Sequence, residues 1–128
     1  MNHPLEETAA PPLVLASQSP RRAEILKMLG LSFETLPAQI VEEQSDQESP
    51  RGYVERLARD KALAVSSLRP GSLVLGGDTV VVAQGQVIEK PTSPGHAVEM
   101  LQSLSGQEHQ VFTGMALVAP EGKVHSTT

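Results

Sequence analysis

The segment Ser17-Gln18-Ser19-Pro20-Arg21-Arg22 brings hydroxyl groups and two guanidinium groups to a predicted strand-to-helix turn. Arg21 and Arg22 fall in the first helical turn, where a cation opposes the helix dipole by about 0.3–1 kcal/mol. A bound anion compensates for this unfavourable interaction, because backbone N–H groups, hydroxyls and guanidinium groups can all converge on it. A capped turn with solvated arginines explains the same residues, and the pattern alone leaves both interpretations open.

Asp78 stands in Gly76-Gly77-Asp78-Thr79, between apolar β-type runs at 73–75 and 80–83. Burying a carboxylate without a partner is costly, and the two preceding glycines let another backbone or a ligand come close. One interpretation is a turn whose carboxylate caps local N–H groups. The other is a metal ligand or general base at a strand end, where α/β sheets place their ligands.

Two lysines break the pattern of their segments. Lys61 lies seven residues after Val54 and four after Leu57, on the apolar stripe of a predicted helix. It either extends its ammonium to solvent along its stem or points it into a cleft. Lys90 ends an apolar strand in Glu89-Lys90-Pro91, a pattern that by itself favours a solvated strand end. His96 and His109 are isolated and receive no catalytic role.

Together these residues form a set of cations around one or two carboxylates, Asp78 and Glu42. Such a set can hold a polyphosphate and cleave it with a metal-activated water. The phosphate-loop patterns G-x-x-x-x-G-K-[ST] and G-x-G-x-x-G are absent, so this hypothesis rests on residue type alone. The cations are Arg21, Arg22, Lys61 and Lys90.

Serine–proline pairs predict where the helices that position these residues begin. A serine N-cap followed by proline at the first helical position opens a helical pattern at Ser19, Ser49 and Ser93. One predicted helix covers 21–29. The second begins at Pro50 and has apolar positions up to Leu68, and the third begins at Pro94 and ends at Gly106. We expect strands at 13–16, 31–36, 73–75, 80–83, 86–89, 111–118 and 122–126, with a hairpin turn at 84–85.

The order of these elements indicates an α/β or α+β layered domain with a mixed sheet flanked by helices. We expect residues 1–12 to be a flexible tail, 13–128 to be the domain and the acidic stretch 42–49 to be a surface loop. The predicted core includes the apolar helical positions, listed here by helix: Ile25, Leu26 and Leu29; Val54, Leu57, Ala58, Ala62, Val65 and Leu68; Ala97, Met100, Leu101 and Leu104.

Composition narrows the classes of function. The chain has 128 residues, a formal net charge of −5 and no cysteine. The length suits one domain, and the lack of cysteine excludes a disulfide framework or a cysteine nucleophile within it and fits a cytoplasmic protein. The negative charge argues against a nucleic-acid polymer as partner, and no apolar run is long enough to span a membrane. The few aromatic residues argue against a base-stacking surface: Phe33, Tyr53 and Phe112.

The same segments, taken in order, resemble the Maf family of septum-formation-inhibitor-like nucleoside triphosphate pyrophosphatases. The matching pieces span about 13–118, and several long motifs in the right order are more specific than any single one. They are LASQSPRRAEIL at 15–26, the Glu42-Glu43 loop, YVERLARDKA at 53–62, LGGDTVV at 75–81, VIEKP at 87–91 and MLQSLSGQEHQVFTG at 100–114. The resemblance implies a mixed-sheet fold like that of inosine triphosphate pyrophosphatases.

The resemblance also implies a reaction and roles for residues. Family members hydrolyse a nucleoside triphosphate to the monophosphate and pyrophosphate, with a divalent cation such as Mg²⁺ or Mn²⁺. By motif, Asp78 is the catalytic carboxylate and a metal ligand, and Glu42 joins it at the metal. The phosphate-binding groups by the same matching are Ser17, Arg22, Lys61 and Lys90.

Arg21 and Thr79 match the branch of the family that acts on dTTP and UTP, whereas the branch preferring methylated guanine nucleotides carries Trp at the first arginine position. The resemblance further implies hydrolysis of modified nucleotides, a house-cleaning role and a homodimer. Family domains continue beyond the matched motifs, so we expect the domain to lack its C-terminal third. The alternative functions are an inactive fragment that binds nucleotide or a partner, and a regulator of septum formation.

Overall fold

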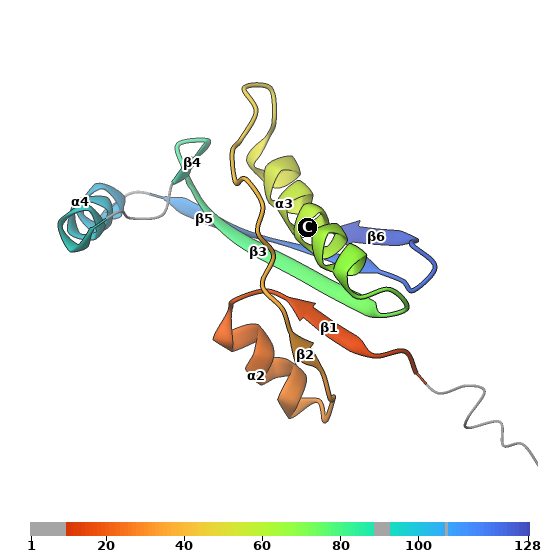
Figure 1. The fold of residues 1–128 in the computed structure, drawn as a ribbon. Helices are drawn as coiled ribbons and strands as arrows, with labels where there is room; N and C mark the ends of the chain where they lie inside the picture. The colour runs from red at the N-terminus through yellow and green to blue at the C-terminus, as the bar shows by residue number, and fades with distance from the viewer. Residues whose placement is uncertain (1–9, 89–92, 107) are drawn as a thin grey trace, which may run out of the picture.

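Strand β3, Leu73–Ala83, is the central strand of a mixed sheet (Figure 1). The computed structural model describes residues 10–88, 93–106 and 108–128, and within them the sheet has six strands. Their order is β2 (Glu34–Thr35), β1 (Leu13–Ala16), β3, β5 (His109–Val118) and β6 (Val124–Thr127), with β4 (Gln86–Ile88) paired to the end of β3. β1 runs parallel to β2 and β3, whereas β4, β5 and β6 pair antiparallel with their neighbours. The predicted layered α/β fold with a mixed sheet is confirmed.

The Gly76–Thr79 segment lies inside β3, so the interpretation of this segment as a turn between two strands is wrong. The antiparallel partner β5 pairs with β3 from Val74 to Ala83 and places Gly114 opposite Asp78. This continuous ladder pairs the backbone N–H and C=O groups of the segment, where the glycines alone suggest that the strand ends. Asp78 does not end its own strand, but β1 stops beside Gly76, two residues earlier. Asp78 therefore lies just beyond the carboxyl end of β1.

All three helices begin at the predicted serine–proline pairs. They are α2 (Pro20–Met28), α3 (Pro50–Leu68) and α4 (Pro94–Leu104). Each serine hydroxyl accepts a hydrogen bond from the backbone N–H three residues later, at 3.4, 3.0 and 3.1 Å in chain order. This bond satisfies one of the N–H groups that a helix start leaves unpaired. None of the described helices is long and apolar enough to cross a membrane.

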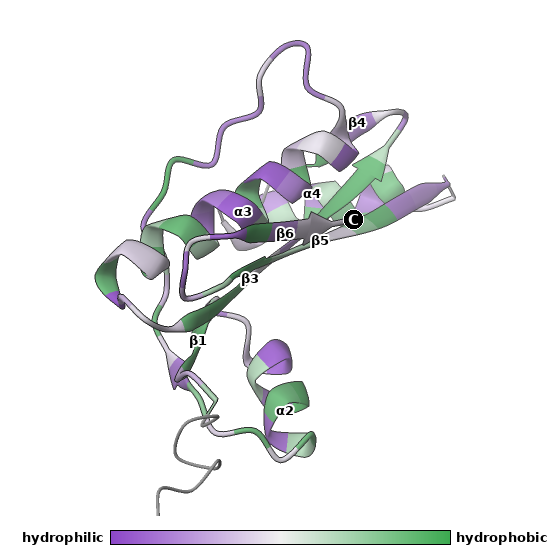
Figure 2. Ribbon diagram, turned by 90° about the vertical axis from the view of Figure 1, so that its right-hand side faces the viewer, coloured by the Kyte–Doolittle hydropathy of each residue, from purple (hydrophilic) through white to green (hydrophobic). Residues whose placement is uncertain are grey.

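Helix α3 lies across one face of the sheet, whereas α2 lies on the other side of the sheet, beside β1 (Figure 2). The apolar stripe of α3 packs on β3 and β5 and supplies most of the buried helical residues. In the other helical segments, the predicted core includes residues that the structure leaves exposed. Leu68 ends α3 in solvent, Leu26 is the only buried residue of α2, and no residue of α4 is buried within the described chain. The exposed predicted core residues include Ile25, Leu29, Leu68 and Leu101.

Two of the predicted strands are shorter or shifted. The 31–36 segment contributes only Glu34–Thr35 to the sheet, and β6 covers Val124–Thr127 instead of 122–126. The 42–49 segment has no helix or strand, as predicted for a loop. The predicted tail falls mostly on residues 1–9, which lie outside the described residues, as does residue 89 at the end of the predicted 86–89 strand.

Glycines at two strand positions let α3 approach the sheet closely. A Cβ atom at Gly76 would collide with the backbone oxygen of Ala58 and stand 3.0 Å from the backbone nitrogen of Ala62. A Cβ atom at Gly114 would stand 2.9 Å from the Cα atom of Glu55. Both obstacles are helix backbone, which cannot move aside alone. The glycines therefore set the distance between helix and sheet.

We predict that Gly76→Ala destabilises the fold by about 1–3 kcal/mol, since the added methyl group forces α3 away from β3. The matched change is Gly95→Ala in the first turn of α4, where a Cβ meets only the Ser93 hydroxyl at 3.9 Å. That change should leave stability equal or slightly higher, because alanine is the better helix former. Urea denaturation followed by circular dichroism measures both, and equal losses would contradict the close-packing account.

Candidate functional site

A small cleft opens where β1 ends and β3 continues. Its volume is about 310 Å³, and it collects groups from the β1–α2 turn, the loop before α3, α3 itself and β3. The end of β1 leaves space beside β3, and the turn into α2 closes one side of that space. Most of the predicted site residues that the structure describes line it: Ser17, Arg22, Glu42, Lys61 and Asp78.

Arg22 lies at one side of the small cleft, held by two hydroxyl groups. Its Nη1 donates to Ser17 Oγ at 3.3 Å and its Nη2 donates to Thr79 Oγ1 at 2.8 Å. Gly77 makes room for this side chain, because a Cβ there would stand 2.7 Å from Arg22 Nε. Arg22 is therefore oriented by the protein, which contradicts the solvated interpretation for this residue.

Arg21 behaves differently from its neighbour. It is exposed on the first turn of α2 and lines neither this cleft nor the larger one described below. Thr79, its predicted companion in specificity, is tied to Arg22 and also pairs with the Thr113 hydroxyl on β5, the two oxygens lying 3.1 Å apart. Thr113 carries no charge and breaks no pattern, so nothing in the sequence distinguishes it as a site residue.

Lys61 occupies the other side of the small cleft, between two carboxylates. Its Nζ lies 3.4 Å from Asp78 Oδ2 and 3.7 Å from Glu42 Oε1. The side chains of Lys61 and Asp78 are only 14% and 10% exposed. Of the two interpretations of Lys61, the one that points its ammonium into a cleft is confirmed.

Asp78 and Glu42 are the described residues that best fit a metal ion. Among the residues that the structure describes, no group of three or more histidine, aspartate or glutamate side chains could hold one. Two carboxylates nevertheless suit Mg²⁺, which commonly takes one or two carboxylates and completes its shell with water and substrate phosphate oxygens. Asp78 also accepts the backbone N–H of Thr79 at 3.0 Å, which fixes one carboxylate oxygen.

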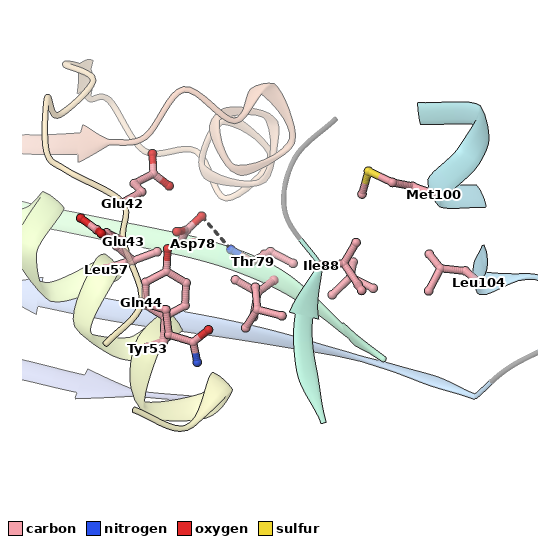
Figure 3. Close-up of a pocket in the computed structure, with 13 residues that line it drawn as sticks. Glu42, Glu43, Gln44, Tyr53, Leu57, Asp78, Thr79, Ile88, Met100 and Leu104 are labelled. Carbon is pink, nitrogen blue, oxygen red and sulfur yellow. Dashed lines mark hydrogen bonds between the residues drawn. The ribbon is translucent and has the colours of Figure 1, made fainter. Parts of the chain in front are cut away.

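A larger cleft of about 810 Å³ shares Glu42 and Asp78 with the small one (Figure 3). Its remaining wall is mainly apolar, from α3, β3, β4 and α4. This shape suits a ligand with a charged end and a flat organic end. The residues that line it besides those two carboxylates are Glu43, Gln44, Tyr53, Leu57, Thr79, Val80, Val81, Val87, Ile88, Met100 and Leu104.

Tyr53 is a residue of this cleft that the sequence analysis missed. It lies on α3 four and eight residues before Leu57 and Lys61, which places all three on one helix face. Its hydroxyl end points toward the carboxylates in Figure 3. Burial, and then the charges of Glu42 and Asp78, raise the pKa of the Tyr53 phenol, so it remains a neutral hydrogen-bond donor. Helical spacing from Lys61 would have been the signal to find it.

Lys90 is the one predicted site residue that lies outside the described part of the chain, in the segment 89–92. Its proposed contact with phosphate stays a prediction.

One family model covers the whole sheet and the residues that line both clefts. Residues 12–128 match the family model described as Maf-like protein. Proteins named dTTP/UTP pyrophosphatase from Photorhabdus laumondii and Escherichia coli K12 are 54% and 51% identical over 106 residues, covering 82% of this chain and 54% of theirs. The relative of that name from Syntrophus aciditrophicus is 49% identical, over 83% of this chain and 52% of its own. The chain thus spans about half the length of these curated relatives.

Solved structures with the same fold are more distant in sequence. A nucleoside-triphosphatase/dITP/XTP pyrophosphatase from Mycobacterium abscessus aligns with a TM-score of 0.54 at 18% identity, covering 91% of this chain and 70% of that one. The Ham1 protein of Staphylococcus aureus aligns with a TM-score of 0.55 at 13% identity, covering 90% and 67%. These similarities support the expected fold type.

We predict that Lys61→Met destabilises the fold by about 1–3 kcal/mol at pH 7, because Asp78 is left buried without its cation. The double variant Lys61→Met/Asp78→Asn should recover part of that loss. Lys27→Met, at an exposed position on α2, serves as the control and should stay within about 0.5 kcal/mol of wild type. Chemical denaturation of wild type, the single variants Lys61→Met and Asp78→Asn, the double variant and the control measures this coupling, and strictly additive losses would show that the pair does not interact.

Proposed function

The chain belongs to the Maf-like protein family, and on that premise we propose that it hydrolyses nucleoside triphosphates to the monophosphate and pyrophosphate. The observation that carries the proposal is Lys61, which lies between Asp78 and Glu42 opposite an arginine fixed by Ser17 and Thr79. In this arrangement the two cations can bind a polyphosphate, and the carboxylate pair can hold a metal ion that contacts it. The names of the relatives support the same reaction.

The proposed step is attack of water on the α-phosphorus. A P–O bond to the water oxygen forms, the bond from the α-phosphorus to the bridging oxygen breaks, and pyrophosphate leaves with that oxygen. Asp78 accepts the proton of the attacking water. Mg²⁺ or Mn²⁺, held by Asp78 and Glu42, would supply a Lewis acid for the phosphate oxygens.

Arg22 and Lys61 then bind the phosphate chain from opposite sides of the small cleft. Arg22 presents a planar guanidinium whose direction is set before substrate arrives, which lowers the ordering cost of binding. Ser17 is proposed to contact phosphate beside Arg22, and Lys90 to add a further cation. The apolar wall of the large cleft is proposed to take the sugar and base.

We propose dTTP and UTP as the preferred substrates, with Arg21 and Thr79 as the residues that set this preference. The names of the relatives support this choice. Hydrolysis of modified nucleotides, a house-cleaning role, a cytoplasmic location, a homodimer and the absence of a nucleic-acid partner stay predictions.

We predict that the chain releases pyrophosphate from dTTP and UTP with Mg²⁺ or Mn²⁺, and that Asp78→Asn lowers kcat about 100-fold or more, since the proton acceptor is lost. Asp46→Asn, on the exposed part of the loop before α3, is the matched control and should keep the wild-type rate. A coupled pyrophosphate assay measures both. Nucleotide binding without release by wild type would instead support the inactive-fragment alternative.

We predict that Arg22→Lys raises the KM for dTTP about tenfold, because an ammonium group cannot bridge Ser17, Thr79 and phosphate as a guanidinium does. Arg59→Lys on α3, which lines neither cleft, should leave the KM unchanged. Steady-state kinetics at fixed metal concentration separates KM from kcat. An unchanged KM in Arg22→Lys would remove Arg22 from the phosphate site.

A further inference from the structure

Arg56, on α3, makes a set of contacts that the catalytic proposal does not use. Its Nε and Nη2 bind the two carboxylate oxygens of Glu48 at 2.7 and 3.0 Å, in a bidentate pair. Nη2 also donates to the backbone oxygen of Glu43 at 2.8 Å, and Nη1 donates to Asp60 at 3.2 Å. One guanidinium thus ties the loop before α3 to the helix itself.

Glu48 in turn organises the loop. Its carboxylate accepts the backbone N–H of Ser45 at 3.3 Å, and its backbone oxygen accepts the side-chain amide of Gln44 at 2.8 Å. The segment 36–49 contains no helix or strand, so these contacts stand in for a regular hydrogen-bond ladder. Fixing such a backbone costs conformational entropy, which a charged bidentate pair helps to offset.

The loop matters because Glu42 precedes Glu43 directly. The peptide oxygen that Arg56 holds belongs to the residue next to the carboxylate beside Lys61 and Asp78. Figure 3 shows Glu42 above Asp78 and Glu43 to its left, both on this segment. A shift of the loop away from α3 would carry the Glu42 carboxylate with it.

We propose that Arg56 and Glu48 are positioning residues: their ion pair holds the Glu43 carbonyl against α3 and thereby directs Glu42 into the metal site. The inference rests on the proposed function, in which Glu42 is a metal ligand. Partners that orient metal ligands are commonly worth about 10–100-fold in metal affinity or activity. Arg56 also lowers the pKa of Glu48 through its hydrogen bonds, so the pair is fully ionised at neutral pH.

The same helix offers a matched control. At its C-terminal end, Arg69 makes a bidentate pair with Glu34 of β2, with Nε–Oε1 and Nη2–Oε2 distances of 3.0 and 2.8 Å. That pair links α3 to another segment in the same way, but neither residue lines either of the two clefts described above. Any loss shared by both arginine variants is therefore general destabilisation.

The test is the dissociation constant of Mn²⁺, measured by the electron paramagnetic resonance signal of the free ion. We expect Arg56→Ala to raise this constant about tenfold or more, with Arg69→Ala close to wild type. Arg56→Lys, which keeps a cationic donor for the Glu43 carbonyl and for Glu48, should lie between Arg56→Ala and wild type. Circular dichroism identifies any variant that fails to fold, and Arg56→Lys then decides.

Equal Mn²⁺ affinity in Arg56→Ala and Arg69→Ala would overturn the inference, as would a wild-type chain that binds no Mn²⁺. Because this measurement needs no turnover, it is separate from the proposed function. A wild-type chain that binds Mn²⁺ in an Arg56-dependent way but releases no pyrophosphate would support the positioning role and refute the hydrolase.

Discussion

The Lys61 ammonium lies beneath α3, 3.4 Å from Asp78 and 3.7 Å from Glu42. The two carboxylates repel each other, and the cation between them offsets that repulsion. The rest of the site follows from that arrangement. The loop before α3 must come back to the helix to deliver Glu42, and β3 must carry its aspartate under the helix instead of turning away. The interaction thus joins three segments that are distant in sequence.

Close contact between α3 and the sheet makes this interaction geometrically available. Gly76 and Gly114 leave no side chain between the helix backbone and the strands, so Lys61 on the helix can reach Asp78 on the strand. A wider separation would open the space to water, where the same pair would be worth far less. The lack of a side chain at Gly76 and Gly114 therefore accounts both for the close packing of α3 on the sheet and for the ion pair in the cleft.

The sequence predicts best what is decided locally. A serine hydroxyl and a proline ring fix each helix start within a few residues, so all three starts were predictable. The continuity of β3 was not, because its ladder comes from β5, about 35 residues later, while the local Gly-Gly pair favours a turn. The direction of Lys61 depended on tertiary packing. Tyr53 and Arg56 escaped notice because a tyrosine and an arginine on a helix break no pattern.

Strand β3 turns Asp78 toward α3 and the next residue, Thr79, toward Arg22 on α2. The carboxylate beside Lys61 and the hydroxyl that holds Arg22 therefore belong to consecutive residues of one strand, on opposite faces of the sheet. Gain or loss of a single residue within this strand would exchange the two faces and break the contacts of both residues together. Evolution of such a centre is confined to replacing side chains at constant length, and changes of length are left to the surrounding loops.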